Sequence, residues 1–275
     1  MAQKIAYLDC HSGISGNMFL GAMLDAGLSF DILREALSAL PLDGYTLKYE
    51  PFLDHGITGA HFDVTLLTDQ KQPSRGFKAI VDLLRLSTLS PQVRERAISI
   101  FRALGEAEAA IHGVSLDDVH FHEVGAVDAI IDITGAAIAI EALGIDQLYS
   151  SPLPLTHGHM RMAHGLMPLP APATLAILSK VQAPWVPCHL ETELVTPTGA
   201  AILAVLARFE MPPIVIEKVG YGFGTKRLSW PNCVRTFLGH SYSQGFSHPN
   251  YDHSHDHEHT HNHSHNHGPL PEHSI

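Results

Sequence analysis

The chain lacks the features that mark secreted and membrane-spanning proteins. Its three cysteines, Cys10, Cys188 and Cys233, are odd in number and far apart, so they give no disulfide framework and fit a reducing compartment. No apolar run is long enough to span a bilayer, and the N-terminal residues carry no signal-peptide core. We therefore expect a cytoplasmic protein with no membrane partner.

Positive charge is also scarce. Lysine and arginine number 17 against 28 aspartates and glutamates, which gives a formal net charge of −11 at pH 7. A nucleic-acid binder needs a basic face, so this balance argues against nucleic acid as a partner. Without the C-terminal tail roughly 240 residues remain, enough to bury a sizeable core. We expect a folded body over residues 1–240 and a disordered tail over residues 241–275.

In the tail, one stretch has histidine at every second position. Its eight histidines are His253, His255, His257, His259, His261, His263, His265 and His267. The residues between them are polar or acidic, so no apolar side chain is present to offset the entropy of ordering. Imidazole nitrogens suit nickel, copper and zinc. The varied spacers favour a metal-gathering tail over two alternatives, a purification tag and a solvated tail without a role.

Apolar runs and helical periodicities alternate along the body. We expect strands at 5–9, 45–52, 61–67, 119–124, 147–155, 214–219 and 233–238. We expect helices at about 18–26, 30–40, 77–86, 91–112, 127–143, 172–180 and 197–209. A turn through Gly56 and Gly59 would join the second and third strands. This alternation predicts an α/β fold, with α+β as the alternative, in which helices flank a mixed sheet.

The first candidate site is the loop that follows the first strand. Asp9 ends that strand, and the turn Ser12-Gly13-Ile14-Ser15-Gly16-Asn17 leads into a helix. Open α/β sheets bind ligands at the carboxyl ends of strands, and a helix N-terminus offers unpaired N–H groups to an anion. The loop lacks both the Walker lysine and the dinucleotide spacing. A phosphate-binding loop and a purely structural turn therefore both stay open.

The second candidate site combines histidines with carboxylates. His120 and His122 alternate on an expected strand and would point to one side, with Glu123 next to them. Asp128 and Asp132 are spaced i, i+4 and share one face of the following helix. These groups suit a borderline metal ion. The alternative is two interior histidines bonded to the backbone and an aspartate that caps the helix. We favour the metal site, because carboxylates in so apolar a helix need partners.

Three further segments carry weaker signals. Thr196-Pro197 has the pattern of a helix N-cap, and we expect it to be structural. The segment His157-Gly158-His159, with Arg161 and His164, is expected to be a solvated loop, with a ligand-binding loop as the alternative. The glycines between 220 and 224 indicate either a close approach of backbone to a ligand or a loose turn.

Several of these motifs together resemble the nickel-insertion proteins of nickel-pincer nucleotide biosynthesis, the LarC family. The matching segments are 8–10, 12–16, 119–125 with 128 and 132, 153–155, 170–174, 193–201 and 220–225. They occur in order and span residues 5 to 239. On this resemblance, residues 1–240 are the N-terminal nickel-insertion domain.

The resemblance implies an enzyme, a nickel chelatase or cyclometallase of the lyase class. Such proteins insert Ni²⁺, their substrate metal, into pyridinium-3,5-bisthiocarboxylic acid mononucleotide in a CTP-dependent reaction that makes the cofactor of lactate racemase. A histidine-rich segment is typical of the family. The family's C-terminal domain binds CTP with Mn²⁺ or Mg²⁺, so we expect that portion as a separate chain or frameshift product. We also expect a homo-oligomer.

Roles follow as hypotheses. Catalytic residues would be Asp9, Asp128 and Asp132, and the substrate phosphate would bind at Ser12, Gly13, Ser15, Gly16 and Asn17. Metal ligands would be His120, His122 and Glu123, with the eight tail histidines as collectors. Two features depart from the family: Asn17 stands where an acid is often expected, and the histidines lie at the end of the chain. Two alternatives remain, a nickel store or metallochaperone and a metal-dependent hydrolase.

Overall fold

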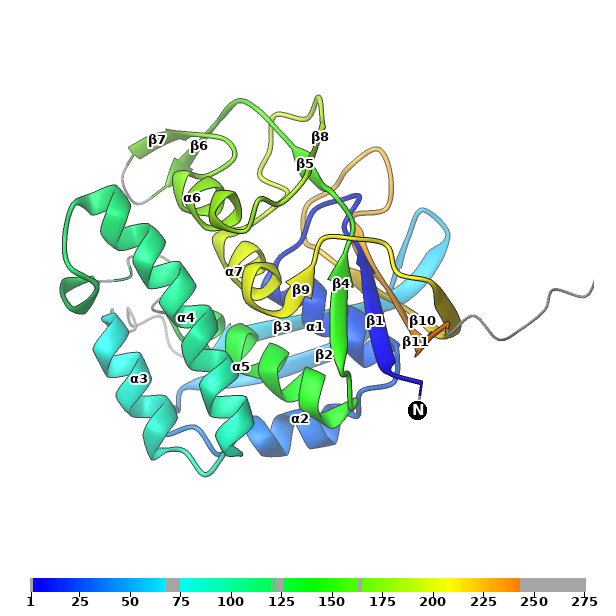
Figure 1. The fold of residues 1–275 in the computed structure, drawn as a ribbon, viewed down its shortest axis with the longest axis horizontal. Helices are drawn as coiled ribbons and strands as arrows, with labels where there is room; N and C mark the ends of the chain where they lie inside the picture. The colour runs from blue at the N-terminus through cyan, green and yellow to red at the C-terminus, as the bar shows by residue number, and fades with distance from the viewer. Residues whose placement is uncertain (1, 68–74, 120, 122–125, 163–164, 243–275) are drawn as a thin grey trace, which may run out of the picture. The chain divides into compact units, whose positions relative to one another are not determined.

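A mixed sheet organises the described residues, which are 2–67, 75–119, 121, 126–162 and 165–242 of this computed structural model (Figure 1). Within them the sheet has seven strands, in the order β2-β3-β10-β11-β1-β4-β9. The strands are β1 (Lys4–Asp9), β2 (Tyr45–Asp54), β3 (Ile57–Leu66), β4 (Gln147–Ser150), β9 (Ala207–Arg208), β10 (Ile214–Phe223) and β11 (Cys233–Ser241). Strand β1 is parallel to β4 and antiparallel to β11. The predicted α/β fold with a mixed sheet is confirmed.

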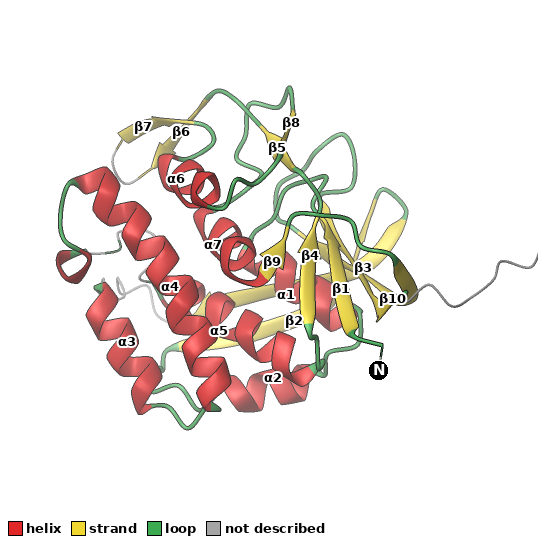
Figure 2. Ribbon diagram, viewed as in Figure 1, coloured by secondary structure: helices red, strands yellow, loops and turns green. Residues whose placement is uncertain are grey.

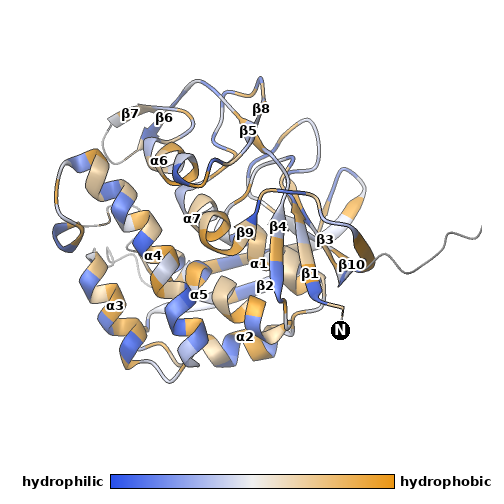
Figure 3. Cartoon of the chain, in the orientation of Figure 1, coloured by the Kyte–Doolittle hydropathy of each residue, from blue (hydrophilic) through white to orange (hydrophobic). Residues whose placement is uncertain are grey.

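Helices pack against this sheet and against one another (Figure 2). They are α1 (Gly16–Asp25), α2 (Phe30–Leu37), α3 (Phe77–Leu86), α4 (Pro91–His112), α5 (Val127–Ala142), α6 (Pro172–Lys180) and α7 (Pro197–Leu206), with the 3₁₀ helix η1 (Leu116–Asp118). Helix α1 contacts β3 and β10, and α5 contacts α1, α2, α4 and α7. Because α5 is apolar around most of its circumference (Figure 3), it can be buried on nearly every side.

The expected strand 147–155 is wrong as a single element. It divides into β4 in the main sheet and β5 (Leu153–Leu155), which pairs with β8 (Trp185–Pro187). The break falls at Pro152, which has no N–H to donate to a sheet ladder. The expected loop at 157–164 is also partly strand, because β6 (His159–Met162) pairs with β7 (Gly165–Pro168). His164 lies outside the described residues.

Two glycine predictions are corrected as well. Gly59 lies within β3, and the turn before that strand is made by His55 and Gly56, both with positive φ. The glycines between 220 and 223 lie within β10, where they face α1. A Cβ on Gly222 would lie 1.9 Å from the Met18 carbonyl oxygen, so this position admits the close approach of a helix. The need for glycine here is explained by packing, without a ligand.

The expected strand 119–124 is not borne out where the structure describes it. Val119 and Phe121 are buried but belong to no strand, and η1 precedes them. The metal site was predicted partly because His120 and His122 would point to one side of this strand, and that argument no longer holds. Residues 120 and 122–125 lie outside the described residues, as does the tail beyond 242, so the division at residue 240 stays a prediction. Among the described residues, no helix is long and apolar enough to cross a membrane.

Candidate functional site at the start of the first helix

The glycine-rich turn after β1 is packed tightly against a distant segment of the chain. Gly13 has a φ of +82°, and a Cβ there would lie 2.0 Å from the carbonyl oxygen of Leu194. The Ile14 N–H donates to that same oxygen at 2.9 Å, and the Thr196 N–H donates to the Ile14 carbonyl at 3.0 Å. The Thr196 side chain accepts from the Gly199 N–H at 3.1 Å and caps α7, as predicted. Packing therefore explains Gly13 without a bound phosphate.

Asp9 forms an ion pair across the sheet. It lies opposite Arg235 on the neighbouring strand β11, and Nε of Arg235 donates to its Oδ2 at 2.9 Å. A second guanidinium nitrogen, Nη2, donates to the same oxygen. The hydrogen bond to Asp9 is the main reason that the pKa of Arg235 is raised. Asp9 is thus held as the counter-ion of an arginine, at the opposite end of the loop from Asn17.

Ser12, predicted to bind substrate, holds an aromatic side chain in place. Its buried hydroxyl donates to the Pro231 carbonyl at 2.9 Å and accepts from Nε1–H of Trp230 at 3.1 Å. Sequence reasoning missed Trp230, because 218 residues separate it from Ser12 and no local pattern links them.

Asp132 connects the two sites that were predicted separately. A Cβ on Gly16 would lie 2.4 Å from its Oδ2 and 2.5 Å from its Cβ, so α5 touches the first residue of α1. The backbone N–H of Asn17 donates to this carboxyl group. Beside them the Ser15 hydroxyl donates to Oδ1 of Asn17 at 2.5 Å. A helix N-terminus favours an anion, and here the chain supplies its own carboxylate.

The environment of Asp132 is unusual for an acid. Its Oδ1 is buried and has no hydrogen-bond partner among the described residues. Burial, followed by the charges of Asp128 and Asp63, raises the pKa of Asp132 well above the ordinary value, and the Asn17 hydrogen bond opposes this only in part. A carboxyl group whose pKa is raised in this way can exchange a proton closer to neutrality. Asp63, on β3, was not among the predicted site residues.

The predicted histidine ligands cannot be placed. His120, His122, Glu123 and the eight tail histidines (His253, His255, His257, His259, His261, His263, His265 and His267) lie outside the described residues. Within the described parts of the chain, no group of three or more His, Cys, Asp or Glu side chains is arranged to hold a metal ion. Of the predicted site residues, the structure brings Ser15, Gly16 and Asn17 next to Asp132, and Asp128 lies close enough to Asp132 to raise its pKa.

Comparison with known proteins gives a consistent result. A family model described as "Nickel insertion protein" matches residues 6–266. A "Putative nickel insertion protein" from Thermomicrobium roseum is 48% identical over 241 residues, covering 87% of this chain and 59% of that protein. A "Pyridinium-3,5-bisthiocarboxylic acid mononucleotide nickel insertion protein" from Desulfitobacterium hafniense is 47% identical over 238 residues, covering 86% and 58%. No solved structure matches. The chain spans about three fifths of the length of these relatives.

Proposed function

The chain belongs to the nickel insertion protein family, and we propose that it inserts nickel into pyridinium-3,5-bisthiocarboxylic acid mononucleotide. The observation that carries the proposal is the match of the family model over residues 6–266. The printed name of the Desulfitobacterium hafniense relative supports this choice of substrate. Because the chain covers only part of each relative, the activity of the whole relative comes to it as a proposal.

The reaction needs a group that takes up a proton. Insertion replaces the hydrogen on one ring carbon by nickel and forms two sulfur–nickel bonds, so the ring proton must pass to a base. Asp132, on α5, has a pKa raised mainly by burial, so it is suited to hold a proton that the reaction releases. We propose that Asp128 and Asp132 serve the metal and proton steps, and that Asp9 orients Arg235.

Nickel would reach this region in two stages. The tail histidines gather Ni²⁺ in exchanging complexes, because imidazole binds nickel and eight imidazoles lie close together in sequence. His120, His122 and Glu123, which directly precede α5, then take up the ion. Asp128 lies in the first turn of that helix and is exposed, so it can complete such a ligand set.

We also propose that the reaction requires CTP and that CTP does not bind to the described part of this chain. At the start of α1 the Asn17 N–H donates to Asp132. In the loop after β10, Nζ of Lys226 donates to the Glu193 carbonyl. Burial lowers the pKa of Lys226. Neither group is therefore ready to hold a triphosphate. We propose that CTP binds with Mn²⁺ or Mg²⁺ to the part of the relatives that this chain does not cover, and that the assembly is a cytoplasmic homo-oligomeric lyase.

Mass spectrometry of the nucleotide tests the proposal. The chain is incubated with the thiolated pyridinium mononucleotide, Ni²⁺, CTP and Mg²⁺, with and without the C-terminal portion of a relative. We expect a nickel-containing nucleotide when both parts are present. Nickel that stays on the protein would indicate a store, and a nucleotide that loses sulfur without gaining nickel would indicate a hydrolase. Either result would refute nickel insertion, provided that a full-length relative metallates the same substrate.

A further inference from the structure

Two clefts share one wall at the carboxyl end of β1. The apolar cleft has a volume of about 330 Å³, and its lining includes three prolines, Val186 and Leu190, together with Cys188 and His189. The charged cleft has a volume of about 430 Å³, and its lining includes Asp9, Ser12 and Arg235. His11 and Trp230 line both clefts, and their ring centroids lie 6.1 Å apart. The two clefts therefore adjoin at these two side chains, and we refer to them as the apolar half and the charged half of one candidate site.

Trp230 is fixed before any ligand arrives. Its indole N–H donates to Ser12, whose hydroxyl in turn donates to the Pro231 carbonyl. Ser12 is 3% exposed, so solvent does not compete for these hydrogen bonds. A positioned indole face offers a stacking surface for a flat ring, and a positively charged ring gains a further cation–π attraction.

The charged half can hold an anion. Asp9 accepts hydrogen bonds from Nε and Nη2 of Arg235, whereas a guanidinium has five N–H donors. The Arg235 side chain is 47% exposed and lines the charged cleft, so N–H donors that Asp9 does not use remain for a ligand. Planar guanidinium groups bind phosphate oxygens well.

We propose that the two clefts together bind a heteroaromatic mononucleotide. The ring lies in the apolar cleft against Trp230, the phosphate lies at Arg235, and the ribose spans the wall formed by His11 and Trp230. Only the choice of a pyridinium ring rests on the proposed function, because stacking and anion binding follow from the residues themselves. The substrate phosphate is thus assigned to Arg235 instead of the Gly13–Asn17 turn.

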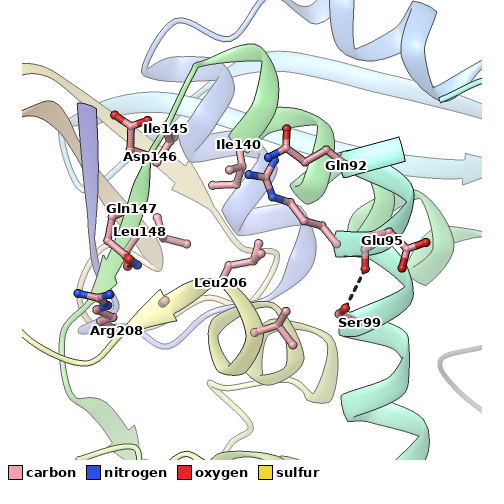
Figure 4. A pocket seen from close by; sticks show the side chains of 13 residues that line it. Gln92, Glu95, Ser99, Ile140, Ile145, Asp146, Gln147, Leu148, Leu206 and Arg208 are labelled. Atoms are coloured by element: carbon pink, nitrogen blue, oxygen red, sulfur yellow. Dashed lines mark hydrogen bonds between the residues drawn. The ribbon is translucent and has the colours of Figure 1, made fainter. Parts of the chain in front are cut away.

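A third cleft provides a control. It has a volume of about 510 Å³ and lies between α4, β4 and β9 (Figure 4). It also contains an exposed arginine, Arg208, but no aromatic side chain is among the described residues that line it. The Asp146 carboxylate in its wall accepts from the Lys4 backbone N–H at 2.8 Å. Changing Arg208 to alanine removes the same charge as changing Arg235 to alanine, and Arg208 lines neither half of the proposed site.

Fluorescence tests the assignment. The chain has two tryptophans, so Trp185→Phe leaves Trp230 as the only one. The probe is nicotinic acid mononucleotide, a pyridinium mononucleotide without sulfur, added without nickel or CTP. We expect saturable quenching of Trp230. Arg235→Lys and Arg235→Ala should each weaken binding by about tenfold or more, because alanine removes a hydrogen bond between charged groups and lysine cannot form the paired hydrogen bonds of a guanidinium. Arg208→Ala should leave the affinity unchanged.

A second probe separates the two halves of the site. Nicotinic acid riboside, which has the same pyridinium ring and ribose but no phosphate, should quench Trp230 weakly and equally in the parent and Arg235→Lys chains. The thermal midpoint of each variant shows whether it is folded. Absence of quenching by the mononucleotide, or an equal loss of affinity in Arg208→Ala and a folded Arg235→Lys chain, would overturn the assignment. Since no nickel is present, a failure of nickel insertion leaves this result unaffected, and the proposed function would survive a failure here.

Discussion

Replacing Asp132 by asparagine should stabilise the folded chain at alkaline pH and at the same time impair nickel insertion. The pKa of Asp132 is raised in the folded chain, mainly by burial, so ionising it there costs free energy that the unfolded chain does not spend. A pKa difference of one unit corresponds to about 1.4 kcal/mol. Asparagine has the same shape, carries no charge and keeps an oxygen for the Asn17 N–H. In a domain of this size each kcal/mol changes Tm by about 2–4 °C, so we expect a gain of a few degrees.

The sign of this effect depends on pH. Between the ordinary aspartate pKa and the raised pKa of Asp132, the folded chain binds more protons than the unfolded chain, so parent stability falls as pH rises. At pH values above the raised pKa, the folded parent chain bears the whole free-energy cost of an ionised Asp132. At pH values below the ordinary aspartate pKa, Asp132 is protonated in both states and this cost is absent. The Asp132→Asn chain should therefore melt higher than the parent at pH 8, and the two midpoints should converge as pH falls towards 4.

Scanning calorimetry from pH 4 to 9 measures this difference. Asp82→Asn, an exposed aspartate on α3, is the matched control and should change Tm little at any pH. If Asp132→Asn melts several degrees below the parent at pH 8, Asp132 is a stabilising carboxylate. Its proposed part in proton transfer would then lose its physical basis.

Three further predictions concern the turn, the tail and the nucleotide. Gly13→Ala should cost about 2–4 kcal/mol, because it adds strain at positive φ to a clash with the Leu194 carbonyl, whereas Gly144→Ala, at a φ of +63° in open space, should cost only about 1 kcal/mol; equal losses in calorimetry would contradict this. Deleting the residues after Gly245 should leave Tm nearly unchanged, and a loss of several degrees would show that the tail packs on the body. Titration calorimetry should detect no CTP binding by this chain alone, and tight binding with Mg²⁺ or Mn²⁺ would place a nucleotide site in the body.

Local signals were enough to predict much of the fold. Helix α4 was predicted with its observed bounds, because Pro91 can only begin a helix and Gly113 ends it in the left-handed conformation. Ser90 adds a side-chain cap, accepting from the Val93 N–H at 3.1 Å. The strand prediction at 147–155 failed because apolar periodicity alone does not show that Pro152 sends the chain out of the main sheet.

The site was less predictable, because its contacts join residues far apart in the sequence. Asp132 and Asp9 were both identified as candidate acids, but only the fold shows that the first meets Gly16 and the second meets Arg235. Trp230 and Asp63 had no local motif to mark them. Such contacts depend on how β11 pairs with β1 and how α5 packs on α1, which periodicity does not specify.

The central claim is that residues of the body, and not the tail, transfer nickel to the nucleotide. The most direct test is to measure the insertion rate at a series of Ni²⁺ concentrations. Three chains are compared, each with the C-terminal portion of a relative: the parent, the chain deleted after Gly245, and the His120→Ala, His122→Ala double variant. We predict that the tail-deleted chain is slow at limiting Ni²⁺ and recovers the parent rate when Ni²⁺ is in excess. The double variant should insert no nickel at any concentration while keeping the parent thermal midpoint. A folded double variant that inserts nickel at the parent rate would contradict the account.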